Sequence, residues 1–367
     1  MIDNEALKQR YEPAVVQSVN AQRQLLTARF SPCGRFVIAG GFDGVINRWD
    51  IAGDEPAAMP PVNLHHAWVD SLALKKERDI AFTADSWGTL VCWPYADDSP
   101  QPIWQNEQAH DGWIRRIALR PDGMQIATCG TDRAVRIWSS ADGAPLLTLP
   151  HEHDVAVIAW HPTEPVLVTG SAYGEVVAWS LPDGKELRRY DAAQLFLEHR
   201  LQEVGGIRSI ALSDDGRLLV IGGTVPKNGG NVQGVPTLLL FDFQTGELHR
   251  TVELGKTSDV YPTDLAFHPD GFLAATVSGN PGTGKLVFLH PESDQPFFET
   301  NTLSNCHTVS LHPDGRRLVV NSTNTGSNGN GRNLDENGNY VGNFSPLHFL
   351  SIPEEPAGAA EDPAADS

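Results

Sequence analysis

Short apolar runs alternate with polar turns along most of the chain. In the clearest stretch, the runs 114–119, 124–129, 134–138 and 145–149 are separated by turns rich in Asp and Gly, such as Pro121-Asp122-Gly123. Apolar runs this short, joined by such turns, are typical of antiparallel strands connected by hairpins. This stretch therefore predicts four antiparallel strands that form one structural unit.

The turn between the first and second runs recurs seven times, with successive copies 41 to 55 residues apart. The copies are Ser31-Pro32-Cys33-Gly34, Lys75-Lys76-Glu77-Arg78, Arg120-Pro121-Asp122-Gly123, His161-Pro162-Thr163-Glu164, Ser213-Asp214-Asp215-Gly216, His268-Pro269-Asp270-Gly271 and His312-Pro313-Asp314-Gly315. This spacing is typical of all-β repeats arranged in a ring and not of helical solenoids. We therefore predict an all-β fold, a seven-bladed β-propeller of four-stranded antiparallel blades.

The third unit carries four polar residues whose order resembles that of the WD-repeat β-propeller family. They are His110 before the first strand, Thr128 on the second, Asp132 in the second turn and Trp138 on the third. In that family these residue types form a buried hydrogen-bonded tetrad. The chemistry requires them because a buried indole N–H needs an acceptor, which a chain of hydroxyl, imidazole and carboxylate supplies. The resemblance covers residues 13–352.

The other units keep fewer of these positions. Unit two has His65, Thr83 and Trp93 with Trp87 at the acidic position; unit four has His151, Thr169 and Trp179 with Tyr173 there; unit one keeps Asp43 and Trp49; and the last three units carry Phe241, Leu289 and either Phe349 or Leu350 at the tryptophan position. We expect these last blades to depend on apolar packing.

The seventh unit lacks a fourth strand at its C-terminal end. Near the N-terminus, an apolar run at 14–19 belongs to no other unit. The resemblance implies that a strand over residues 13–19 completes blade seven, which removes an open sheet edge from the ring. Residues 1–12 then form an N-terminal extension and residues 13–352 form the propeller.

The chain is strongly acidic, with a formal net charge of −19. Five acidic residues of the segment 353–367 stand among Ala, Pro and Gly. Because such a segment cannot bury enough apolar surface to fold, we expect an acidic disordered tail. The overall charge repels phosphate groups, so we expect neither nucleic acid nor an anionic membrane as a partner.

The four cysteines, Cys33, Cys92, Cys129 and Cys306, lie in different units and form no Cys-x-x-Cys pair. This pattern is typical of unpaired residues in a reducing compartment. The first ten residues lack the apolar core of a signal peptide, and no apolar run has the length of a membrane span. We therefore expect a cytoplasmic protein, without a disulfide framework, that acts as a monomer.

Two kinds of segment depart from the repeat. Leu197, Leu201 and Val204 have helical spacing within the connector 190–205, which predicts a short amphipathic helix that packs on the ring or docks a partner. The second turn is expanded in the last three units, and the segments are 224–235, 279–284 and 321–345. Long loops in a compact domain are usually functional or disordered, and both readings stay open.

Three aromatic residues occupy one repeated position. Trp68 and Trp113 each follow the first-strand histidine by three residues, and Tyr261 stands at the equivalent place in unit six. Aromatic residues are enriched at interface hot spots, although propellers also use them to pack neighbouring blades. Both roles stay open, and we name the three as candidate partner-binding residues.

We expect a non-catalytic scaffold for protein–protein interaction, which is what the family resemblance implies. No catalytic residue, metal site or cofactor is predicted. The alternative is a lactonase-like or hydrolase-like propeller enzyme, or a small-ligand binder at the channel mouth. The segment His151-Glu152-His153-Asp154 offers groups for metal or acid–base chemistry, but His151 already belongs to the tetrad pattern.

Overall fold

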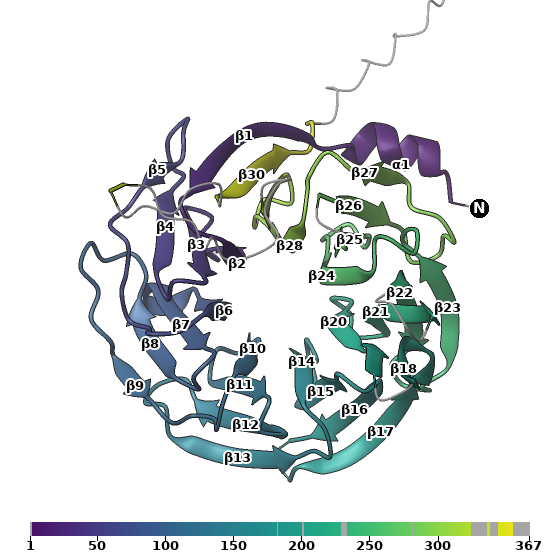
Figure 1. The fold of residues 1–367 in the computed structure, drawn as a ribbon, viewed down its shortest axis with the longest axis horizontal. Coiled ribbons are helices and arrows are strands. Elements are labelled where there is room, and N and C mark those ends of the chain that lie inside the picture. Colours follow the sequence, from purple (N-terminus) through teal and green to yellow (C-terminus); the bar gives the residue numbers. More distant parts are fainter. Residues whose placement is uncertain are drawn as a thin grey trace, which may run out of the picture.

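The computed structural model describes residues 2–181, 183–199, 202–228, 233–279, 282–323, 336–337 and 344–354. Seven four-stranded antiparallel sheets are arranged around a central axis, with one strand of each sheet facing the centre (Figure 1). The prediction of an all-β, seven-bladed propeller is therefore confirmed. None of the described helices is long and apolar enough to cross a membrane.

Each of the first four blades runs from the innermost strand outwards in chain order. The strands of blade one are β2 (Leu25–Phe30), β3 (Phe36–Gly41), β4 (Ile46–Asp50) and β5 (Ala57–Ala58); those of blade two are β6 (Val69–Lys75), β7 (Ile80–Asp85), β8 (Leu90–Pro94) and β9 (Trp104–Asn106). Blade three has β10 (Ile114–Leu119), β11 (Gln125–Gly130), β12 (Ala134–Ser139) and β13 (Pro145–Pro150); blade four has β14 (Val155–Trp160), β15 (Val166–Ser171), β16 (Glu175–Ser180) and β17 (Lys185–Asp191).

The remaining blades follow the same plan, except that the last one uses both ends of the chain. Blade five has β20 (Ile207–Leu212), β21 (Leu218–Asn228), β22 (Gln233–Asp242) and β23 (Leu248–Glu253); blade six has β24 (Tyr261–Phe267), β25 (Leu273–Ser278), β26 (Gly284–Leu289) and β27 (Phe298–Thr300); blade seven has β28 (Cys306–Leu311), β29 (Arg317–Ser322), β30 (Ser345–Ser351) and β1 (Ala14–Ala21). Outside the blades lie the helix α1 (Asn4–Tyr11), the 3-10 turns η1 (Glu77–Asp79) and η2 (Ala193–Leu195), and the hairpin of β18 (Phe196–His199) and β19 (Gln202–Gly205).

The hydrophobic core is divided into seven clusters, and each lies between two neighbouring blades. Between blades two and three, for example, Phe82 packs with Ile126 and Trp138. A single blade is one sheet and cannot bury both faces by itself, so each blade depends on its neighbours. The ring as a whole is therefore the unit that buries the apolar residues.

The two ends of the chain meet in blade seven. β1 pairs antiparallel with β30, from Ala14 opposite Ser351 to Ala21 opposite Ser345. Figure 1 shows β1 along the outer rim beside β30, next to the helix α1. Tyr11 of α1 is buried, and its hydroxyl donates to Asp270 Oδ2 at 2.7 Å.

The repeated first turn requires a backbone conformation that favours glycine. Gly123 has φ 71° at the last position of its turn. In blade two the corresponding residue is Arg78, which has φ 65°, and the turn becomes the 3-10 turn η1. A residue with a Cβ is strained in this left-handed region, which explains the Gly in most copies.

The prediction of a helix over residues 190–205 was wrong. The segment contains η2 followed by the β18–β19 hairpin, in which Leu197 pairs with Val204. Gly205 and Gly206 have φ values of 98° and 97°, which end the hairpin in a conformation that a helix cannot adopt. Apolar residues seven apart satisfy a helical pattern, but they can equally face each other across a short hairpin.

The prediction of a loop over 224–235 was also wrong for most of that segment. β21 and β22 continue their pairing beyond the blade, with Thr224 opposite Pro236 and Val225 opposite Val235. The insertion therefore lengthens a hairpin. Residues 280–281 of the blade-six segment, and 324–335 and 338–343 of the blade-seven segment, lie outside the described residues.

Candidate functional site at the channel mouth

The four tetrad residues of blade three form one hydrogen-bonded chain. Trp138 Nε1 donates to Thr128 Oγ1 at 2.8 Å, and Thr128 Oγ1 lies 2.7 Å from His110 Nε2. His110 Nδ1 in turn lies 2.9 Å from Asp132 Oδ1. Burial would raise the pKa of Asp132, but the hydrogen bond and charge of His110 lower it below its ordinary value. The hydrogen-bonded chain joins β11, β12 and the turn between them to the segment that precedes β10.

Blade two contains an equivalent chain, so the reading of Trp87 as the residue that replaces its acid was wrong. His65 Nδ1 lies 3.1 Å from Asp85 Oδ2, and His65 Nε2 lies 2.8 Å from Thr83 Oγ1. The carboxylate comes from the last residue of β7, two positions before the expected one. Trp87 is 70% exposed. The available sequence signal was Asp85, which stands two residues after Thr83 in the same strand.

Blade four replaces the carboxylate with a backbone group. His151 Nδ1 lies 3.0 Å from the carbonyl oxygen of Leu149, and His151 Nε2 lies 3.1 Å from Thr169 Oγ1. Trp179 Nε1 donates to the same Thr169 hydroxyl at 3.0 Å. Tyr173 stacks instead on His153, with ring centroids 4.2 Å apart.

In the last three blades, the register decides which residue stands at the tryptophan position. Trp138 pairs with Ile126, and the equivalent pairs are Phe241 with Leu219, Leu289 with Leu273 and Leu350 with Leu318. Of the two candidates in blade seven, Leu350 is therefore the equivalent residue. All of these side chains are buried and apolar, so no indole N–H has to be satisfied there.

Every innermost strand has a β-bulge near its start, and sequence reasoning missed this feature. In β10, for example, the register shifts between Ile114 and Arg116, which leaves Arg115 unpaired. The extra residues of the seven strands are Leu26, Asp70, Arg115, Ala156, Arg208, Thr263 and His307. Bulges re-aim side chains next to functional sites. We call these seven residues the bulge ring.

The bulge ring lines a central cavity of about 490 Å³. Other residues of its wall include Trp113, Arg116, Asp154 and Tyr261. A cavity of this size is the kind of place where proteins hold ligands. A sequence signal for the cavity exists, because its lining residues Asp70 and Arg115 each follow an aromatic residue, Trp68 or Trp113, by two positions.

The cavity wall is rich in charged groups. It contains Arg115, Arg116 and Arg208 against Asp70 and Asp154. Burial lowers the pKa of Arg115, because desolvation disfavours a cation. Burial likewise raises the pKa of Asp70 to about 7 and lowers that of His307 to about 4. At neutral pH the wall therefore carries more positive than negative charge, within a chain that is strongly acidic.

The predicted aromatic residues lie at the start of the inner strands, and two of them line the cavity. The Arg115 guanidinium lies 3.7 Å from the centre of the Trp113 ring, and that of Arg208 lies 4.8 Å from the centre of Tyr261. Trp68 contacts Trp113 edge to face, with ring centroids 5.5 Å apart, but does not line the cavity. All three aromatic side chains are partly exposed.

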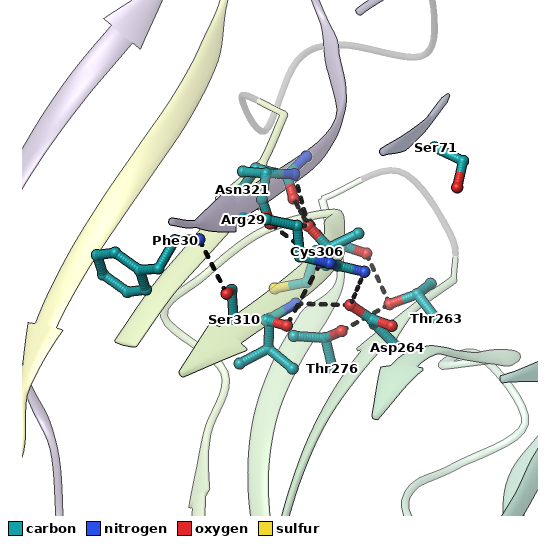
Figure 2. Close-up of polar contacts among 12 residues, drawn as sticks. Arg29, Phe30, Ser71, Thr263, Asp264, Thr276, Cys306, Ser310 and Asn321 are labelled. Atoms are coloured by element: carbon teal, nitrogen blue, oxygen red, sulfur yellow. Dashed lines mark hydrogen bonds and ion pairs between the residues drawn. The ribbon is translucent and has the colours of Figure 1, made fainter. Parts of the chain in front are cut away.

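A polar seam joins blades six, seven and one beside the cavity (Figure 2). Asp264 Oδ2 lies 2.9 Å from Arg29 Nη2 and accepts from the Val309 N–H at 3.1 Å. Thr263 Oγ1 donates to the Cys306 carbonyl at 3.1 Å. These contacts hold the inner strands of three blades at fixed spacing.

The side chains of the segment 151–154, which offered groups for enzyme chemistry, do not gather at one site. His151 belongs to the blade-four tetrad position, whereas Asp154 lines the cavity. Glu152, His153 and Glu175 bring ligand atoms within 4.8 Å of one another, and Glu152 is exposed. Glu175 Oε2 also lies 2.9 Å from His153 Nδ1, so these two residues form a side-chain contact at the surface.

The hydrogen-bonded set of hydroxyl, imidazole, carboxylate and indole is complete in blades two and three. This set is the feature in which the blades resemble WD repeats. A family model described as WD domain, G-beta repeat matches residues 16–50, 103–139 and 143–180. Each match begins in or near an outer strand and ends in the third strand of the next blade. The matched segments are WD repeats within a seven-bladed β-propeller, as the tetrad pattern predicted.

Among curated proteins, the chain is 25% identical over 173 residues to Protein groucho of Drosophila melanogaster, which covers 47% of the chain and 23% of that protein. It is 23% identical over 187 residues to Transducin-like enhancer protein 2 of Mus musculus, covering 50% and 24%. It is 22% identical over 187 residues to Protein HIR1 of Eremothecium gossypii, covering 47% and 19%. The matches span less than a quarter of the length of these relatives.

Proposed function

We propose that the protein is a non-catalytic scaffold whose partner, another protein, binds the face with Trp68, Trp113 and Tyr261. The observation that supports this most directly is the position of Trp113 and Tyr261 on the cavity wall, each with a guanidinium over its ring. Partly exposed aromatic residues beside Arg are the residue types that dominate binding energy at protein interfaces. The surrounding sheets hold them rigidly, which limits the entropy lost on binding.

The proposal extends to the setting in which the protein works. We propose a monomer in the cytoplasm that binds neither nucleic acid nor membranes. The net charge of −19 and the four unpaired cysteines, three of them buried, support this setting.

The proposal is tested by comparing binding at the two faces of the ring. The wild-type chain is used to purify partners from the native host, and the affinity of each purified partner is then measured by calorimetry. We expect Trp68→Ala/Trp113→Ala to weaken binding by about 2 kcal/mol or more, because both rings would be lost from one hot spot. Circular dichroism and thermal unfolding show whether the variant is folded.

The matched control introduces charge on the opposite face. Lys76→Glu/Asp214→Lys changes two exposed residues in the first turns, at the other end of the inner strands. Asp270 also lies in a first turn, but it is not used for the control because its carboxylate accepts a hydrogen bond from the Tyr11 hydroxyl. Binding that survives in the tryptophan variant and is lost in this control would place the interface on the other face and overturn the proposal.

A further inference from the structure

Three arginines in the central cavity lack an acidic partner. Arg115, Arg116 and Arg208 line the cavity, and none of them forms an ion pair or a side-chain hydrogen bond with the described residues. Elsewhere on the ring, arginines such as Arg29 and Arg136 do pair with carboxylates. Cations that line a cavity without a carboxylate partner are candidates for holding an anionic ligand.

Two further polar atoms of the wall are buried without a hydrogen-bond partner. They are the indole Nε1 of Trp113 and the Oδ1 atom of Asp70. Both residues line the same cavity as the three arginines. A buried indole N–H can only donate, and the Trp113 indole faces the Asp70 carboxylate closely enough to lower the pKa of that acid. The three arginines therefore favour a ligand oxygen that carries negative charge.

We propose that the cavity binds the carboxylate of a Glu or Asp side chain on an extended segment of the partner, with Arg115, Arg116 and Arg208 around it. This proposal rests on the proposed function and specifies the partner chemistry. Guanidinium groups can hold a carboxylate through two parallel hydrogen bonds. The rings of Trp68 and Tyr261 then flank the backbone on either side of the inserted side chain.

The balance of charge favours a carboxylate over a phosphate group. The three arginines are opposed by Asp70 and Asp154, which leaves a formal excess of one positive charge on the wall when both acids are ionised. A single carboxylate neutralises that excess, whereas a phosphate monoester carries almost twice its charge at neutral pH. A peptide source is favoured because Trp68, Trp113 and Tyr261 offer apolar contact that a free anion would leave unused.

Asp70 works against this ligand, and its removal provides a positive test. Its carboxylate lies in the cavity with one oxygen unpartnered. Besides Asp70, the charged or titratable residues of the wall are Arg115, Arg116, Asp154, Arg208, Tyr261 and His307. Replacing the carboxylate with an amide removes one negative charge that faces the incoming anion. We therefore expect Asp70→Asn to strengthen binding of an acidic peptide several-fold.

The experiment uses the full chain and end-capped peptide libraries with a fixed central residue and random flanking positions. The central residue is Glu, Gln or phosphoserine in three separate libraries. We expect enrichment of the Glu library at least tenfold over the Gln library. Arg208→Gln should abolish this preference without unfolding the chain, because Arg208 is exposed. Arg133→Gln, at an exposed residue in a second turn on the same face, is the matched control and should keep it.

The outcomes separate this inference from the proposed function. Equal retention of the Glu and Gln libraries, or a preference for phosphoserine, would overturn the carboxylate proposal. The carboxylate proposal is also overturned if the native partner binds Trp68→Ala/Trp113→Ala more weakly but binds Arg208→Gln normally. That result would leave the scaffold function in place. If the tryptophan variant binds the partner normally, the proposed function fails. Binding of free glutarate as tightly as the Glu peptides would overturn the peptide source.

Discussion

At the scale of single residues, the role of a polar side chain depends on which hydrogen-bonding partners lie within its reach. Asp132 and Asp85 come from different positions in their repeats, yet each accepts from a histidine that also contacts a threonine. The side chain of His65 is fully buried, and that of Asp85 is 2% exposed. A partner lost from such a chain leaves a buried polar group unsatisfied, which costs more than the hydrogen bond itself contributes.

We expect Asp132→Ala and Asp85→Ala each to lower the free energy of unfolding by roughly 1 to 3 kcal/mol, because each leaves a histidine without its acceptor. Urea denaturation followed by circular dichroism measures the change. Trp87→Ala is the control, since its 70% exposed side chain should contribute within about 0.5 kcal/mol. If the aspartate variants match this control, the tetrads do not stabilise the blades.

At the scale of elements, the strand β1 links the first residues of the chain to the last blade. It covers β30, whose other side pairs with β29. A sheet edge left uncovered presents unpaired N–H and C=O groups to other chains. The helix α1 makes a separate contribution, because it packs Tyr11 into the cluster between blades six and seven.

Deletion of residues 1–21 should therefore expose the edge of β30 and lower stability by roughly 3 kcal/mol or more, at about 1 kcal/mol for each lost strand hydrogen bond. Deletion of residues 1–12 removes α1 alone and serves as the control. We expect only the longer truncation to associate with further copies of itself, which light scattering measures. Thermal unfolding measures the loss of stability. A long truncation that stays monomeric and is no less stable than the short one would contradict the role of β1.

At the scale of the whole molecule, the ring is held closed by contacts between residues far apart in the chain. Asp264 of blade six reaches Arg29 of blade one across the inner strand of blade seven, as Figure 2 shows. The two side chains are 11% and 26% exposed. An ion pair this protected from solvent, with a further backbone N–H bound to Asp264, couples three blades at once.

Asp264→Ala should lower the free energy of unfolding by about 3 kcal/mol, because it leaves the Arg29 charge and the Val309 N–H without a partner. Asp264→Asn should cost less, since an amide oxygen can still accept from Val309. Thermal and urea unfolding measure both. The control is Arg35→Ala, which removes an exposed ion pair with Asp50 and should change stability by less than about 1 kcal/mol. A loss in Asp264→Ala no greater than in this control would show that the seam does not hold the ring.

The sequence by itself determined the repeat, the blade architecture and the blade-three tetrad. These depend on local patterns: strand length, turn residues such as Gly123 at positive φ, and polar residues at fixed spacing within one unit. The aromatic position shared by Trp68 and Trp113 is likewise visible in the repeat. Each of these features is specified within a single blade.

Only the tertiary structure decided features that depend on how strands pair and how blades meet. The connector near Leu197 forms a hairpin because a partner strand is available. Asp85 supplies the carboxylate of the blade-two tetrad, in place of a residue at position 87, because it reaches His65. The bulges that turn Arg115 and Arg208 into one cavity arise from strand register, which sequence spacing does not reveal. The charged cavity brings together residues from every blade, so it exists only once the ring has closed.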